Sequence, residues 1–77
     1  MTKEISDLGL IAGLVTKGYE PIESFKQGTR VIFVFEWDEI IGGLETDYFS
    51  NSLEVDASTY QRTLRDIKRA IYSMESK

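Results

Sequence analysis

The stretch YEPIESFKQGTRVIFVFE, residues 19–36, decides the fold. Gln27-Gly28 is a turn signal between two β-prone runs, which predicts a β-hairpin, and Pro21 confines the first run to an edge strand. The second run is apolar on both faces, with Val31, Phe33 and Phe35 on one and Ile32 and Val34 on the other. Such a strand is expected to be central in its sheet and covered on both sides, by helices or by another subunit.

Helices are predicted on both sides of this hairpin in the chain. Before it, a broad apolar stripe between Ser6, the expected N-cap, and Gly18, the expected stop, predicts a mostly buried helix at about residues 7–17. After it, apolar residues recur at helical spacing and predict a second helix at about residues 38–49. The residues expected to hold this second helix to the sheet are Ile40, Ile41 and Leu44.

The rest of the chain predicts a strand and a long helix. Residues 50–55, SNSLEV, are expected to form a turn and a short third strand. Asp56 or Ser58 is then expected to cap a helix whose apolar residues follow one another at spacings of four, three, four and three positions. These core-facing residues are Tyr60, Leu64, Ile67, Ile71 and Met74. The sum is a single α+β domain, residues 1–77, in which a small antiparallel sheet packs with three helices in the order α-β-β-α-β-α.

Composition narrows the chemistry that 77 residues can perform. The chain has no Cys and no His, which removes thiolate nucleophiles, disulfides and the commonest general base and metal ligand. Calcium loops of EF-hand type need acids at alternating positions, and residues 38–47, DEIIGGLETD, put isoleucines where ligands should be. We therefore expect a protein that is not an enzyme, with no catalytic residue, no metal and no cofactor.

Acidic residues form one continuous block. Residues 31–56 hold seven acids and no base, whereas residues 57–77 hold five bases and two acids. Each acid alone is explained as a solvated residue or, in the first turn of a helix, as one favoured by the helix dipole. Together they create a field that would attract a basic protein surface. The candidate partner-binding residues are Trp37, Asp38, Glu39, Glu45 and Asp47.

Trp37 has two interpretations. Large aromatic residues are mostly buried, which favours a core residue. Its position between Glu36 and Asp38, at a junction between strand and helix, instead favours an exposed aromatic anchor surrounded by charge, a common form of interface hot spot.

The last predicted helix carries a basic stripe opposite its apolar one. Arg62, Arg65 and Arg69 fall within about one sixth of a turn of each other, with Tyr72 at the border. Cations beside an aromatic ring can bind nucleic-acid phosphates and stack a base. The plainer interpretation is a solvated helix surface on which Asp66 pairs with the neighbouring arginines, and the net charge of −4 weighs against nucleic acid.

Three stretches carry a resemblance: DLGLIAGLVTKGY (residues 7–19), VIFVFE (residues 31–36) and VDASTYQRTLRDIKRAI (residues 55–71). The chain resembles a family of short uncharacterised domains encoded in bacterial genomes, prophages and phages. Those proteins open with a helix ending in Gly-Tyr, continue with a hairpin whose second strand alternates Phe, and close with a Val-Asp-capped helix. The resemblance implies the α+β fold and a phage or prophage setting, and it implies no activity.

The expected function is that of a non-catalytic small binding module, a phage or prophage accessory protein that binds a host or defence protein through an acidic surface. The alternative is a nucleic-acid accessory protein that uses the basic stripe. Homodimerisation is a third interpretation, because the second hairpin strand is apolar on both faces. The apolar run at residues 8–15 is too short for a membrane span and lacks signal-peptide flanks, so a cytoplasmic location in a bacterial host, without membrane partners, is expected.

Overall fold

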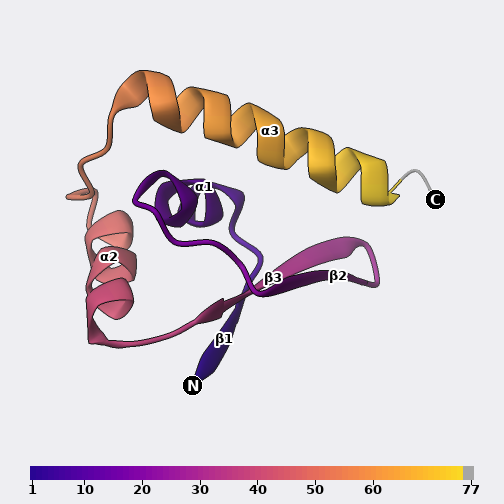
Figure 1. The fold of residues 1–77 in the computed structure, drawn as a ribbon, viewed down its shortest axis with the longest axis horizontal. Helices are drawn as coiled ribbons and strands as arrows, with labels where there is room; N and C mark the ends of the chain where they lie inside the picture. The colour runs from indigo at the N-terminus through magenta and orange to yellow at the C-terminus, as the bar shows by residue number, and fades with distance from the viewer. Residues whose placement is uncertain (76–77) are drawn as a thin grey trace.

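The protein is a three-stranded antiparallel sheet with three helices, seen in a computed structural model that describes residues 1–75. In chain order the elements are β1 (Thr2–Ile5), α1 (Leu8–Thr16), β2 (Glu23–Gln27), β3 (Arg30–Glu36), α2 (Glu39–Phe49) and α3 (Ala57–Glu75). Figure 1 shows α1 at the centre, with α3 and the sheet on opposite sides of it and α2 beside it. The predicted α+β class, with three helices and a small antiparallel sheet, is confirmed.

The third strand lies elsewhere in the chain than predicted. The sheet order is β1-β3-β2, so the N-terminal segment Thr2–Ile5 pairs with the free edge of β3, opposite the hairpin partner. Residues 52–56 follow a turn without pairing in the sheet. Their apolar residue Leu53 instead packs over α1, where Gly13 leaves room for it. The observed order of elements within residues 1–75 is therefore β-α-β-β-α-α.

The central strand β3 is buried on both faces, as predicted, but by two different means. Val31, Phe33 and Phe35 belong to the main core. On the other face, Ile32 lies opposite Phe25. Val34 lies between Glu4 and Glu23 of the two neighbouring strands. Paired residues of antiparallel strands point to the same face, so these neighbours cover Ile32 and Val34, each only 6% exposed. One chain achieves this burial by itself, and homodimerisation stays a prediction.

Each helix begins at an aspartate that accepts a hydrogen bond from the backbone three residues on. Asp7 Oδ1 accepts from the Leu10 amide at 3.0 Å, Asp38 Oδ1 from the Ile41 amide at 2.9 Å, and Asp56 Oδ2 from the Thr59 amide at 2.9 Å. Such caps satisfy amides that have no partner within the helix. The predicted cap of the first helix, Ser6, is wrong by one residue, and Asp56 is confirmed as the cap of the last.

The core is built around α1, which buries five of its nine residues. On α3, Ile67 is buried, and the rest of the predicted apolar stripe packs partly buried against the core, as the sequence indicated. On α2, Ile41 is buried, whereas Ile40 is 69% exposed. The prediction that Ile40 holds this helix to the sheet is therefore wrong. Neighbouring residues lie about 100° apart around a helix, and α2 turns its Ile41 side toward α1.

Candidate binding surface on α2

The outward side of α2 presents an exposed apolar residue together with two carboxylates. Glu39, Ile40, Gly43 and Asp47 are all exposed, and helical spacing brings them to one side of α2. We call these four residues the acidic face. A Cβ atom at Gly43 would meet no other atom within 4 Å, so the centre of the face is open. Neither carboxylate forms an ion pair or a side-chain hydrogen bond with any of residues 1–75.

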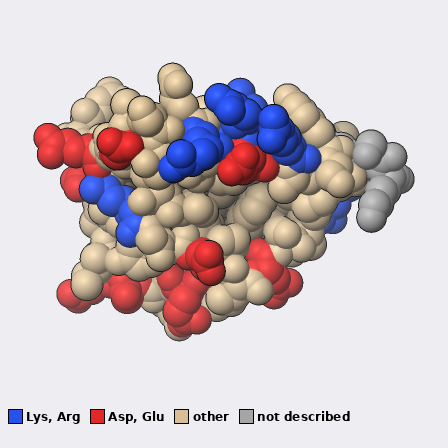
Figure 2. Space-filling view, turned by 45° about the horizontal axis from the view of Figure 1, so that its top comes forward, with Lys and Arg blue, Asp and Glu red and all other residues tan. Residues whose placement is uncertain are grey.

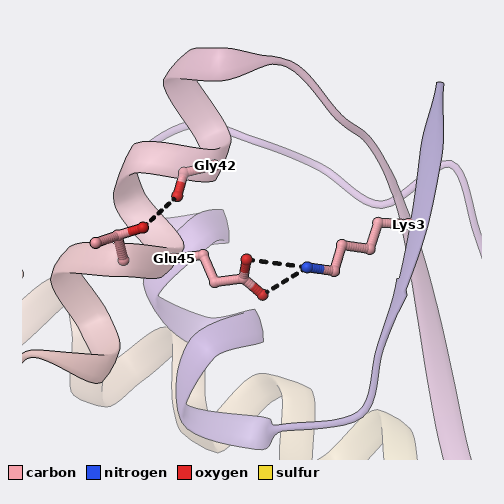
Figure 3. A network of polar contacts seen from close by, with 4 residues as sticks. Lys3, Gly42 and Glu45 are labelled. Carbon is pink, nitrogen blue, oxygen red and sulfur yellow. Dashed lines mark hydrogen bonds and ion pairs between the residues drawn. The ribbon is translucent and has the colours of Figure 1, made fainter.

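Glu45, also predicted to bind a partner, faces inward and is already paired. Figure 3 shows it reaching from α2 toward Lys3 on β1, whose Nζ lies 2.9 Å and 3.0 Å from its two carboxylate oxygens. The Glu45 side chain is only 23% exposed. The Lys3 ammonium therefore largely neutralises the charge of Glu45 within the chain, and Glu45 contributes little to a surface that could bind a partner.

Trp37 and Asp38 have structural contacts that reduce their availability to a partner. Trp37 is half-buried and packs against the core, which is the first of its two interpretations. The Lys3 ammonium lies 4.8 Å from the centre of its ring, within the range of a cation–π interaction. Asp38 is exposed, but one of its oxygens caps α2. Of the five predicted residues, Glu39 and Asp47 alone combine exposure with an uncommitted carboxylate in the described part of the chain.

The acidic block is less extensive in space than in sequence. Besides the Lys3–Glu45 pair, the N-terminal amine lies 2.9 Å from Glu36 Oε1. Both cations come from the first three residues, which β1 places beside β3. Sequence reasoning missed this compensation because it rests on a strand that was not predicted. In the face shown in Figure 2, most basic side chains gather along one edge and most acidic ones along the opposite edge and at one end.

The basic stripe on α3 is exposed, as expected. None of Arg62, Arg65 and Arg69 has an ion pair within 4.0 Å among residues 1–75, so the predicted pairing with Asp66 is not formed there. Arg65 also helps to line a shallow hollow of about 300 Å³, together with Gln61, Leu64 and Lys68. Near this hollow, one or two turns along the helix, Tyr72 is 64% exposed.

A second concavity lies where α2 ends and α3 begins, and sequence reasoning missed it. Its volume is about 310 Å³, and we call it the tyrosine pocket. Its lining residues are Tyr48, Asn51, Leu53, Val55 and Tyr60. Three of them, Asn51, Leu53 and Val55, belong to the segment predicted as a strand. In the structure this segment is not a strand and lines the pocket.

Both tyrosine hydroxyls of this pocket donate to α1 or its cap. Tyr48 Oη donates to Asp7 Oδ1 at 2.9 Å, and Tyr60 Oη donates to the Gly9 carbonyl at 3.1 Å. Burial and the neighbouring Asp7 carboxylate raise the pKa of Tyr48 to about 12. The hydroxyl of Tyr48 therefore stays protonated at neutral pH and ties the C-terminal half of α2 to the start of α1.

No group of three or more Asp and Glu residues within residues 1–75 has a geometry that could hold a metal ion. In that same part of the chain, no helix combines the length and apolar character needed to cross a membrane.

Comparison with known proteins places the chain in a family. Residues 2–73 match the model of the family described as Domain of unknown function (DUF5659). The chain belongs to this family. The match confirms the resemblance to a family of uncharacterised domains, while its phage or prophage setting stays a prediction. Comparison with curated proteins and with solved structures gave no match.

Proposed function

We propose that this member of the DUF5659 family is a non-catalytic binding module that docks on a basic protein surface through the acidic face of α2. The observation that supports this most strongly is the exposed Ile40 on the same side of α2 as two uncommitted carboxylates, those of Glu39 and Asp47. An exposed apolar residue is ordinary by itself. An exposed apolar residue beside charged ones resembles the mixture of apolar and polar groups found at protein interfaces.

The parts of this face would make different contributions to binding. Glu39 and Asp47 would steer a basic partner and select against acidic ones, effects that act mainly on the association rate. Ile40 would supply apolar area that becomes buried at the interface. Gly43, beside it, has no side chain, so the backbone of a partner could approach α2 closely.

We propose further that the partner is a host or defence protein in the cytoplasm of a bacterial cell, and that this chain acts as a phage or prophage accessory protein. The support for this setting is the sequence resemblance of residues 7–19, 31–36 and 55–71.

Affinity capture with charge-reversed variants tests the proposal. The tagged chain is used to capture proteins from a lysate of its native host, in parallel with E39K/D47K and with E20K/E23K. Both double variants replace two exposed acids and change the net charge equally, but the second pair lies outside α2. We expect a basic protein to be captured by the wild type and by E20K/E23K and to be lost with E39K/D47K. Retention of every captured protein by E39K/D47K would contradict the proposal.

A second candidate function is nucleic-acid binding through α3. The observation that favours it is the hollow lined by Arg65 and Lys68, with the unpaired arginines and the exposed Tyr72 near it. Phosphate contacts make such binding strongly dependent on salt, and an exposed aromatic ring can stack a base. This candidate predicts a mobility shift of labelled single-stranded DNA or RNA at low salt that weakens in R62A/R65A/R69A. No shift with the wild type would exclude it.

A further inference from the structure

The tyrosine pocket has no part in the contacts of the acidic face described above. Its volume of about 310 Å³ lies at the small end of the range of ligand sites, which suits a single side chain or a compact ligand. Two aromatic rings and two aliphatic side chains form most of its lining, and Asn51 adds an exposed amide.

The hydrogen-bonding groups of the pocket favour a ligand that donates. A tyrosine hydroxyl has one proton, and those of Tyr48 and Tyr60 are both given to atoms of the chain. What these hydroxyls offer to a ligand is therefore an acceptor lone pair. The side chain of Asn51 has no hydrogen-bond partner among residues 1–75, so its amide oxygen is a further available acceptor.

The charges along the chain at the pocket favour a cation. Residues 37–61 contain no Lys or Arg, and Glu54 and Asp56 are exposed neighbours, in sequence, of the lining residues. Arg62, which follows this stretch, acts on the Asp56 carboxylate and offsets part of its charge. The Asp7 carboxylate lies 2.9 Å from the Tyr48 hydroxyl. After burial, the same carboxylate contributes to the raised pKa of Tyr48. Aromatic faces also attract cations, most often the guanidinium of arginine.

We propose that the tyrosine pocket receives an arginine side chain of the basic partner, an inference that rests on the proposed function. The guanidinium is planar, stacks on aromatic rings and presents five N–H donors. It therefore suits a pocket with two tyrosine rings and several acceptors better than the compact ammonium of lysine does. The apolar stem of the arginine side chain would lie along Leu53 and Val55.

Titration of the ¹⁵N-labelled chain with N-acetyl-arginine amide, followed by NMR, tests this inference without the partner. We expect saturable shifts of the amide signals of residues 51–55 and Tyr60. N-acetyl-citrulline amide has nearly the same shape without the charge, and we expect it to bind about tenfold more weakly, because the cation–π contact and the charge-assisted hydrogen bonds are lost. Equal responses to the two compounds, no response, or equal binding of N-acetyl-lysine amide would overturn the assignment to arginine.

Two variants at Asn51 locate the binding. This residue is exposed and has a φ of 60°, a conformation that glycine adopts readily. N51K places a cation of the chain at the pocket and should abolish the response, whereas N51G keeps the backbone and should weaken it by the loss of one acceptor. An unchanged titration with N51K would overturn the inference. Failure of the arginine amide to bind leaves the capture result with E39K/D47K intact, so the two proposals fail separately.

Discussion

Gly9→Ala tests the packing of α1 against α2. A Cβ atom at Gly9 would overlap the hydroxyl oxygen of Tyr48 and would also lie 3.1 Å from its Cζ and 3.3 Å from its Cε1. Tyr48 must then shift and give up its hydrogen bond to Asp7. A hydrogen bond to a charged group contributes about 1.5–3 kcal/mol, and overpacking costs about 1–3 kcal/mol more.

The net effect is smaller than this sum, because alanine is the better helix former by at most about 1 kcal/mol and Tyr48 is only half-buried. We expect Gly9→Ala to lower the free energy of unfolding by about 2 kcal/mol, a large part of the total of about 4–12 kcal/mol for a chain of this length. The measurement is urea unfolding followed by circular dichroism.

Two controls make the result specific. Gly43→Ala is a helical glycine with open space around it and should stabilise the protein by about 1 kcal/mol. Tyr48→Phe removes the overlapping oxygen together with its hydrogen bond to Asp7, so Gly9→Ala should cost about 1.5 kcal/mol less in that background than in the wild type. If Gly9→Ala stabilised the protein as Gly43→Ala does, the packing of Tyr48 against α1 described here would be wrong.

Three further predictions concern named contacts. The pKa of Tyr48 is raised from 10.0 to about 12, so the contribution of this residue to stability should be complete below pH 10 and be lost as the pH rises toward 12. The difference in unfolding free energy between wild type and Tyr48→Phe should therefore shrink over that range. A constant difference would refute this prediction. Hydrogen bonds from Thr59 lower the pKa of Asp56 from 3.8. The contribution of Asp56 to stability should therefore persist above pH 3.8 and be lost as the pH falls through the lower pKa of the folded state. NMR titration of the Asp56 carboxyl carbon should show the lowered pKa in wild type and a pKa nearer 3.8 in Thr59→Ala. Lys3→Met should change the fluorescence of Trp37 and cost at most about 1 kcal/mol, because the pair with Glu45 is partly exposed; unchanged fluorescence would contradict the contact between Lys3 and the indole.

The sequence predicted correctly the elements whose local pattern of apolar and turn residues matches their place in the folded protein. The hairpin has a turn signal between two β-prone runs, and α3 repeats its apolar residues over nearly its whole length. β1 has only four residues and buries one of them, Ile5, so its sequence carries almost no strand signal. It forms because β3 has a free edge that needs a partner, which is a property of the folded sheet.

The acidic composition of α2 is visible in the sequence, but the geometry of its carboxylates is not. Pairing of Glu45 with Lys3 depends on contact between residues 42 positions apart. The exposure of Ile40 likewise depends on which side of α2 meets α1, and the adjacent isoleucines made both sides plausible. The tyrosine pocket forms because residues 50–56 do not pair with the sheet. The β-prone residues of this segment had predicted a strand instead.

Hydrogen exchange of the chain alone and in complex with the captured basic protein tests whether the acidic face binds the partner. We expect partner binding to slow exchange in α2, around Glu39–Phe49, and to leave the exposed side of α3 at its rate in the free chain. Protection confined to α3, or to the sheet, with α2 unchanged would contradict binding through the acidic face.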